Sequence, residues 1–452
     1  MSEPIETTIQ GLIDDNIIER PIDGNHGSIH PKSTDYVASG IPFVMATDLA
    51  HGRIDFTNCS FITERQATTL RKGFAKVGDV LLSHKATIGR TAIVQDNPYP
   101  FIMLTPQVTY YRIKDKNRLS AKYLKYVFDS YAFQSTMKAW ASDGSTRDYI
   151  GITAQQKLPI FLHSKVQQDR IVELIDPIVQ KIELNRRVNE TLGGMAQAIF
   201  RDWFVDFGPV RRKAAGEADA VAIMGSLTLD PSRAAVLAAL FPAAFSDDGL
   251  PVGWRSEAYS DFVSIIGGGT PKTSEKSYWD GDIPWFSVAD TPAGTDLFVF
   301  DTEKRITQAG LEGSSARLVP AGTTIISARG TVGNLAIAAR DMAFNQSCYA
   351  LRSLEGDRPF FTYLATAHLV QKLKAMAHGS VFSTITRQTF EGVAFPNGGS
   401  LVMDSFEVEV CPLFERVRAA VHESKALAEI RDYLLPRLMS GAVRAAPKTE
   451  AA

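Results

Sequence analysis

Two long stretches of the chain place apolar residues at alternating spacings of four and three. The first covers residues 171–203 and the second 406–438, and eight of ten seam positions are apolar in each. This period predicts two helices with one apolar seam, each about 50 Å long at about 1.5 Å per residue. The apolar seam residues that we expect to form a coiled coil are Ile171, Ile175, Ile178, Ile182, Leu192, Ile199 and Trp203, followed by Phe406, Val410, Leu413, Val417, Leu427, Leu434 and Leu438.

Each stretch contains a proline at the same place, Pro177 and Pro412, which must start the main helix or kink it. Periodicity alone leaves two arrangements open. Each helix could pack on its own globular half, or the two could pack on each other, antiparallel. In the second arrangement, the polar positions Asn189 and Ser424 would pair and help to fix the register.

The remainder of the sequence indicates two globular halves of mixed α and β structure. Short runs rich in β-formers, 79–83 and 324–327, lie between glycine and charged turns, and helical patterns cover 120–139 and 359–377. Between the halves, residues 208–253 have the character of a connector. It contains one short helical pattern at 232–240. We expect a disordered tail from Ala445 onward.

The two halves are related by an internal repeat. Ordered matches recur at offsets that drift between 235 and 244 residues, as loop insertions would produce. The matched pairs are Gly27 with Gly267, Lys32 with Lys272, Tyr36 with Tyr278, Asp48 with Asp290, Gly78 with Gly322, Thr87 with Thr331, Gly89 with Gly333, Tyr123 with Tyr363, and Ser145 with Ser380.

Composition places the chain among globular proteins of a reducing cytoplasm. We find no apolar run long enough to span a membrane, no signal-peptide pattern, and three cysteines without metal spacing. The net charge is −2, but residues 20–159 hold 18 Lys and Arg against 11 Asp and Glu. Residues 255–395 hold 13 against 14, so only the first half has the bias that phosphate contact favours.

The stretch GGGTPKTS at 267–274 raises the question of a phosphate-binding loop. A Walker loop needs glycine directly before the lysine, but Pro271 stands there, and proline removes a donor and fixes φ. A turn between a strand and an extended segment explains the glycines. No motif of a protease, an esterase, an amino-methyltransferase or a zinc site occurs. We therefore expect the chain to have no catalytic residue, no metal site and no cofactor of its own.

Two recurring sets of loop residues have the side chains that read DNA. Arg and Lys can hold guanine, Asn can hold adenine, and Ser or Thr can bond either base. For any single residue a solvated loop side chain is the simpler interpretation, but two sets on a duplicated scaffold favour DNA binding. The first set is Asn25, His26, Lys32, His84, Lys85, Thr87, Arg90, Ser145, Thr146 and Arg147; the second is Thr270, Lys272, Trp279, Arg329, Thr331, Asn334, Ser380, Thr384 and Arg387.

The chain resembles the specificity subunit of type I restriction-modification systems. GNHGSIHPKSTDYVASGIPFVMATDL (24–49) and GGGTPKTSEKSYWDGDIPWFSVADT (267–291) are similar to the opening of its target-recognition domains. KIELNRRVNETLGGMAQAIFRDWFVDFGPV (181–210) and LAEIRDYLLPRLMSGAV (427–443) are similar to its central and C-terminal helical regions. The likeness covers nearly the whole chain except 208–253 and the tail.

The resemblance implies an α+β protein with two mixed α/β target-recognition domains in tandem. Each domain is followed by a long helix, and the two helices pair as an antiparallel coiled coil with pseudo-twofold symmetry. The boundaries we expect are 1–164 for the first target-recognition domain, 165–207 for the central helical region, 208–253 for the connector, 254–401 for the second target-recognition domain, 402–443 for the C-terminal helical region, and 444–452 for the tail.

The resemblance also implies a function without catalysis. Such a subunit reads a bipartite, asymmetric site on double-stranded DNA and scaffolds two methyltransferase (modification) subunits and restriction/translocase subunits. S-adenosylmethionine, ATP and Mg²⁺ then belong to those partners, with methylation at adenine N6. Two other classes of function share the observed features: a stand-alone DNA-binding regulator, and an adaptor that binds only protein.

Overall fold

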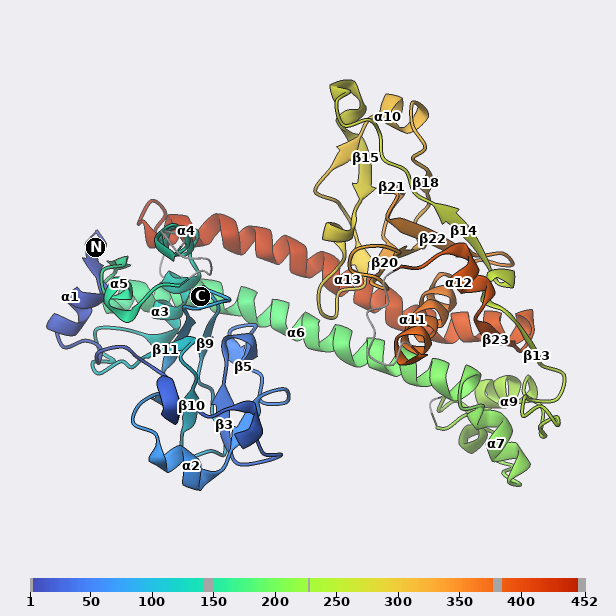
Figure 1. The fold of residues 1–452 in the computed structure, drawn as a ribbon, viewed down its shortest axis with the longest axis horizontal. Coiled ribbons are helices and arrows are strands. Elements are labelled where there is room, and N and C mark those ends of the chain that lie inside the picture. The colour runs from blue at the N-terminus through green and yellow to red at the C-terminus, as the bar shows by residue number, and fades with distance from the viewer. Residues whose placement is uncertain (1–2, 142–148, 227, 377–383, 446–452) are drawn as a thin grey trace, which may run out of the picture. The chain divides into compact units, whose positions relative to one another are not determined.

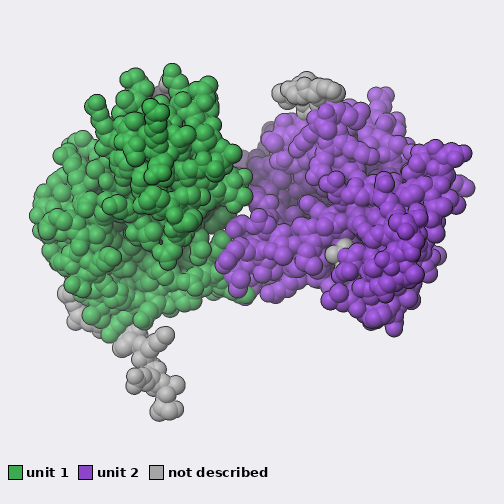
Figure 2. Space-filling view, turned by 90° about the horizontal axis from the view of Figure 1, so that it is seen from below, with its two compact units in different colours: residues 1–183, 426–452 green, residues 184–425 purple. Residues whose placement is uncertain are grey.

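The computed structural model describes residues 3–141, 149–226, 228–376 and 384–445. The predicted tail therefore lies almost wholly outside the described residues. The chain divides into two compact units (Figure 2). Unit 1 is built from residues 1–183 and 426–452, and unit 2 from residues 184–425.

Two forty-residue helices, α6 (Lys165–Phe204) and α13 (Ser400–Met439), are the longest elements (Figure 1). The boundary between the units falls inside both helices, so each unit contains one part of α6 and one part of α13. Both helices begin twelve residues before their proline. Pro177 and Pro412 therefore lie in helix interiors, so of the two expected roles only a kink remains.

In unit 1 the two helix parts share one core with the globular half. Ile171 and Ile175 of α6 and Leu438 of α13 are fully or almost fully buried in the same apolar cluster. His163, just before α6, lies with its Nε2 3.1 Å from the carbonyl oxygen of Met439. In unit 1 the buried seam residues therefore pack on the globular half and on the other helix at the same time.

In unit 2 the two helices run in opposite directions where they meet. Trp203 contacts Phe406 edge to face at a centroid distance of 5.6 Å, and Asn185 donates a hydrogen bond to Ser424 Oγ at 3.2 Å. The predicted partner of Ser424, Asn189, is buried, but its Oδ1 accepts no hydrogen bond. The register prediction for Asn189 was wrong, because Asn185, one seam position earlier, meets both Ala420 and Ser424.

Unit 1 contains two four-stranded sheets, ordered β6-β3-β10-β7 and β2-β11-β8-β9, and two strand pairs, β1-β12 and β4-β5. In the first sheet β3 and β10 are parallel, and the second sheet is antiparallel. The strands are β1 (Ile5–Thr8), β2 (Ile22–Asp23), β3 (Ile41–Val44), β4 (Leu49–Ala50), β5 (Arg53–Ile54), β6 (Ser60–Ile62), β7 (Phe74–Ala75), β8 (Val80–Ser83), β9 (Thr91–Ile93), β10 (Ile102–Leu104), β11 (Val108–Tyr111) and β12 (Pro159–Leu162).

The shorter helices of unit 1 are α1 (Ile9–Asp14), α2 (Glu64–Thr69), α3 (Ala121–Asp129), α4 (Tyr131–Ala141) and α5 (Ile152–Gln155). The single helix predicted over 120–139 is wrong, because the backbone breaks at Ser130 between α3 and α4. Ser130 has extended dihedral angles, and its hydroxyl donates to the carbonyl of Val127 at 2.7 Å. A serine that bonds its local backbone in this way competes with helix continuation.

Unit 2 contains a five-stranded sheet, β14-β22-β19-β20-β16, a four-stranded sheet, β17-β15-β21-β18, and the pair β13-β23. The strands are β13 (Arg255–Ala258), β14 (Val263–Gly267), β15 (Trp279–Phe286), β16 (Phe298–Val299), β17 (Arg305–Ile306), β18 (Leu318–Val319), β19 (Thr324–Ser327), β20 (Leu335–Ala338), β21 (Met342–Phe344), β22 (Cys348–Ser353) and β23 (Ala394–Asn397). Its shorter helices are α10 (Gln308–Glu312), α11 (Pro359–Met376) and α12 (Arg387–Glu391).

The strand orders of the two units correspond except for β16, which has no counterpart in unit 1, and the pair β4-β5, which has none in unit 2. The parallel pair β3 and β10 of unit 1 matches β15 and β21 of unit 2, and both pairs are flanked by antiparallel neighbours. The order β2-β11-β8-β9 matches β14-β22-β19-β20. One chain topology is therefore built twice.

The segment between the halves is folded onto unit 2. It forms α7 (Gly208–Ala214), α8 (Ala220–Ile223) and α9 (Pro231–Ala239), the last where a short helix is predicted. Phe241 packs edge to face on Trp203 at 5.1 Å, and both rings are almost fully buried. This segment contributes to the core of unit 2 rather than serving only to connect.

Candidate nucleic-acid interface

The residues singled out in the first half gather at one edge of a sheet. In unit 1, β2 and β8 both pair antiparallel with β11. Strand β2 ends at Asp23, opposite Thr109, and β8 ends at Ser83, opposite Val108. Two strands antiparallel to the same neighbour point the same way, so the loops that follow them leave from one edge. Residues 24–33 and 84–90 form this edge, which we call edge 1.

Edge 1 presents polar side chains, among them two lysines and an arginine, to solvent. His26, Lys32, Lys85 and Arg90 are exposed, and Thr87 is half-buried. The guanidinium of Arg90 donates to the carbonyl of Thr47 at 3.1 Å, which holds it beside the loop. The assignment of these five residues to DNA contact stays a prediction.

Two members of the first set, Asn25 and His84, are buried instead. The Asn25 carbonyl oxygen accepts the backbone N–H of Arg71 at 2.9 Å, and its amide donates to the carbonyl of Lys72 at 2.6 Å. This is the bonding of a loop anchor, because the whole amide group is used inside the protein. Asn25 thus holds the β2 loop against residues 71–72 and offers no free atom to a base.

His84 is fully buried at the base of its loop. Its Nδ1 lies 3.1 Å from the carbonyl oxygen of Ile150, and burial lowers the pKa of the ring to about 4. The imidazole is therefore neutral at physiological pH. Direct contact with DNA does not agree with this burial, and we assign His84 a positioning role.

An ionic cluster around Asp23 stabilises the start of edge 1. Asp23 lies 2.7 Å from His26 Nε2 and is bonded by the ammonium of Lys72. Burial alone would raise the pKa of this carboxyl, but the bonds from Lys72 and His26 lower it below its ordinary value. The carboxylate therefore stays ionised and neutralises part of the positive charge at this end of the loop.

The second set gathers at the equivalent edge of unit 2. β14 and β19 both pair antiparallel with β22, and they end with Gly267 opposite Tyr349 and Ser327 opposite Cys348. The loops 268–276 and 328–334 therefore leave from one edge, which we call edge 2. Lys272, Arg329 and Thr331 are exposed there, and Thr270, Trp279 and Asn334 are half-buried.

The GGGTPKTS loop at 267–274 is shaped by close packing. A Cβ on Gly268 would stand 2.1 Å from the carbonyl oxygen of Asn345, and one on Gly269 would stand 2.2 Å from Ser315. The Gly269 carbonyl accepts the indole N–H of Trp285 at 2.9 Å. These two glycines are needed because neighbouring backbone leaves no room for a side chain.

The segment before α12 joins edge 2 from a distant part of the sequence. The Thr384 hydroxyl donates to the carbonyl of Ala328 at 3.2 Å, and the Arg387 guanidinium donates to that of Ile265 at 2.7 Å. Both side chains are exposed. The predicted residues Ser145, Thr146, Arg147 and Ser380 lie outside the described residues.

Sequence reasoning missed one residue at edge 1, Tyr149. The residue is 46% exposed, and the Lys85 ammonium lies over its ring, 5.8 Å from the ring centroid. Residues 85 and 149 also form an isolated antiparallel bridge. The repeat offset of 235 residues, which relates Ser145 to Ser380, relates Tyr149 to Thr384 and could have identified it.

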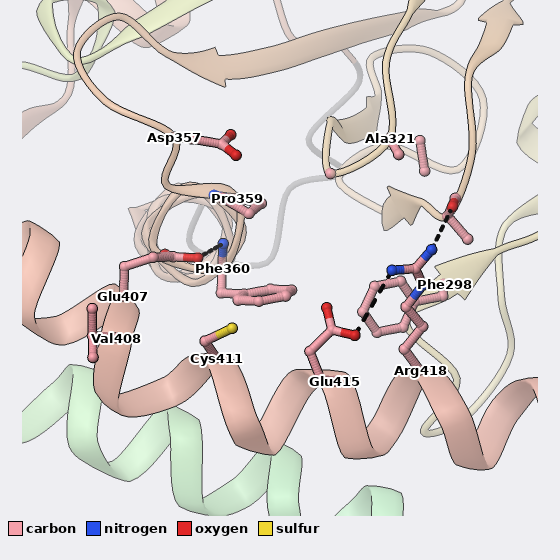
Figure 3. Close-up of a pocket in the computed structure, with 13 residues that line it drawn as sticks. Phe298, Ala321, Asp357, Pro359, Phe360, Glu407, Val408, Cys411, Glu415 and Arg418 are labelled. Atoms are coloured by element: carbon pink, nitrogen blue, oxygen red, sulfur yellow. Dashed lines mark hydrogen bonds and ion pairs between the residues drawn. The ribbon is translucent and has the colours of Figure 1, made fainter.

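A cavity of about 380 Å³ lies elsewhere in unit 2, between α13, the start of α11 and the end of β20 (Figure 3). The carboxylate of Glu407 accepts the backbone N–H groups of Phe360 and Phe361 at 3.1 and 2.7 Å and so caps α11. Burial raises the pKa of Glu407 to about 7. Arg418 on the opposite side donates to the carbonyl of Ala339 at 3.1 Å. These polar groups join α13 to the globular half.

Within the described ranges, helices long and apolar enough to cross a lipid bilayer are absent. The same part of the chain holds no group of three or more His, Cys, Asp or Glu side chains arranged to hold a metal ion.

Comparison with known proteins agrees with this arrangement. Residues 251–396 match the family model described as "Type I restriction modification DNA specificity domain". The chain is 27% identical over 438 residues to the HindI specificity subunit of Haemophilus influenzae, covering 89% of this chain and 94% of that protein. It is 22% identical to the MjaIX specificity subunit of Methanocaldococcus jannaschii, covering 91% and 89%.

A solved structure shares the fold. The type I restriction-modification S subunit from M. genitalium superimposes with a TM-score of 0.54 at 12% identity, covering 96% of both chains. The family match includes edge 2, and the two relatives extend over both units. Over most of its length the chain is thus similar to specificity subunits of type I restriction-modification systems.

Proposed function

We propose that the chain is the DNA sequence-recognition subunit of a type I restriction-modification complex and reads a bipartite, asymmetric site. Unit 1 reads one half-site through edge 1, and unit 2 reads the other through edge 2. The observation that carries this proposal is the duplicated edge. Two sheets of matching strand order present loops with Arg, Lys and hydroxyl side chains at the same edge, in a chain related to specificity subunits.

The helices support a role as spacer and partner surface. Antiparallel pairing of α6 and α13 as a coiled coil would set the unspecified gap between half-sites. Large apolar side chains remain exposed on both helices. Such side chains favour contact with other proteins. They are Val166, Leu174, Leu184 and Met195 on α6, and Leu401, Val408, Ile430 and Tyr433 on α13.

The charge difference between the halves indicates that partners contribute to DNA affinity. Residues 255–395 carry a balance of about −1, which gives little nonspecific attraction to phosphate. Two modification subunits would supply much of the phosphate clamp and bind S-adenosylmethionine for methylation at adenine N6. Restriction/translocase subunits would use ATP and Mg²⁺. The chain itself would supply recognition without catalysis.

Sequencing of N6-methyladenine in single DNA molecules tests this function. The methylome of a host is recorded with and without the gene for this chain, with the partner genes intact and expressed. We expect a split, asymmetric motif whose methylation depends on the gene. Absence of gene-dependent methylation would favour a stand-alone regulator or a protein-only adaptor, and a pull-down would then identify partners.

A further inference from the structure

One backbone connection at edge 1 joins two loops that are far apart in sequence. The His84 N–H donates to the carbonyl of Gln107 at 2.9 Å, and the His84 carbonyl accepts the N–H of Ile150 at 3.0 Å. Residue 84 is thus tied on one side to the turn before β11 and on the other to the segment after α4. The side chains beside this connection, at 85 and 149, are held at a fixed separation.

Edge 2 repeats this connection bond for bond. The Ala328 N–H donates to the carbonyl of Ser347 at 2.7 Å, and the Ala328 carbonyl accepts the N–H of Ile385 at 2.9 Å. Positions 329 and 384 therefore stand where 85 and 149 stand at edge 1. The backbone that carries the four side chains is the same in both units.

The side chains on this shared backbone differ between the units. Edge 1 carries Lys85 and Tyr149, whereas edge 2 carries Arg329 and Thr384, and all four are exposed. The Lys85 ammonium lies over the Tyr149 ring, so the two act as one surface. Packing against the core does not explain the difference, because all four side chains face solvent.

We propose that Lys85 and Tyr149 form a specificity-determining pair that contacts base edges of the first half-site, and that Arg329 and Thr384 form the equivalent pair for the second. This inference rests on the proposed function and names the residues that make its two half-sites unlike. An ammonium group donates to guanine O6 and N7 as a point charge, whereas a guanidinium matches them with two parallel bonds. Unlike pairs on like backbones predict unlike base preferences.

The backbone under each pair is held by a side-chain contact. At edge 1 the buried, neutral ring of His84 lies 5.8 Å from that of Tyr149, and its Nδ1 contacts the Ile150 carbonyl. At edge 2, where residue 328 is alanine, the Thr384 hydroxyl bonds the Ala328 carbonyl instead. Each edge thus fixes the same two strands of backbone by a different side chain.

The test uses the full chain expressed with its modification subunits in a host without other N6-adenine methylation. The motif is read by single-molecule sequencing for the unaltered chain, for Lys85→Ala, and for Lys85→Arg combined with Tyr149→Thr, which places the edge 2 pair on edge 1. The control is Lys116→Ala. Lys116 is an exposed cation in the loop after β11, which leaves the opposite edge of the same sheet.

We expect both edge 1 variants to change discrimination at one base position of one half-site by about 5- to 150-fold, the range for one direct base contact. The other half-site and the control should keep the original motif. An unchanged motif in both variants would overturn the inference. So would a uniform fall in methylation at every motif site, because a phosphate contact lowers affinity without changing the preferred base.

Misfolding of the double variant would abolish methylation altogether. Lys85→Ala then decides, because it leaves every backbone bond of the connection in place. A failure of the proposed function is distinct from all these results, because the unaltered chain would then direct no methylation at a split motif.

Discussion

Four exposed cations on the two edges should determine much of the salt dependence of DNA binding by the assembled complex. They are Lys32 and Arg90 at edge 1, and Lys272 and Arg387 at edge 2. The two arginines are each held by a backbone carbonyl, that of Thr47 and that of Ile265. Such anchoring suits phosphate contact, which positions a protein on the duplex.

The magnitude follows from the number of contacts. Each phosphate that is neutralised contributes about −0.9 to the slope of log K against log salt. Replacing both edge 1 cations by alanine should therefore make the slope shallower by about 1.8, and replacing all four by about 3.6. The ratio of the DNA-binding constant of the unaltered complex to that of the edge 1 double variant should fall about tenfold between about 50 and 200 mM salt.

Equilibrium titration of a labelled duplex with the purified complex, at four salt concentrations, measures these slopes. The matched control removes two cations from the opposite edge of the same sheet, Lys114→Ala with Lys116→Ala, and changes the net charge equally. Its slope should stay close to that of the unaltered complex. If the edge 1 variant and this control had equal slopes, the placement of DNA along edge 1 would be refuted.

Three further predictions concern stability and partners. The pKa of Glu407 is about 7 in the folded chain and 4.5 ordinarily, so the fold favours the protonated carboxyl. Its contribution to the free energy of unfolding should therefore fall by about 3 kcal/mol as pH rises from 4.5 to 7. In denaturant titrations the variant Glu407→Gln should not show this loss, and an equal loss in the variant would contradict the prediction. Trp203→Ala should lower the free energy of unfolding by about 3–5 kcal/mol, because the ring packs on Phe241 and Phe406, and a change below about 1 kcal/mol would show that the connector does not stabilise unit 2. The isolated chain should bind its DNA site weakly and with strong salt dependence. A nanomolar affinity in physiological salt would disprove the idea that modification subunits supply much of the phosphate contact.

The periodic features of the sequence predicted the helical part of the fold closely. The seam series 171–203 and 406–438 lie inside α6 and α13, and every seam position is buried or half-buried. The runs 324–327 and 359–377 correspond to β19 and α11 as far as the structure describes them. These signals are local, because a helix or strand face repeats with a period fixed by the backbone.

Features set by long-range contacts were beyond the sequence. The partner of Ser424 is Asn185 rather than Asn189, because the register of the two helices is set by their packing and places Asn185 beside both Ala420 and Ser424. The roles of Asn25 and His84 as buried anchors depend on residues 46 to 66 positions away, which no spacing rule brings together.

The most direct test of the account exchanges one recognition unit and reads the outcome in the methylome. Residues 19–160 are replaced by the corresponding segment of a relative with a different site, and the chimaera is expressed with the original partners. We predict that one half of the methylated motif changes to that of the donor, while the other half stays the same. A chimaera that directs methylation with both halves altered, or with neither altered, would contradict the assignment of one half-site to each unit.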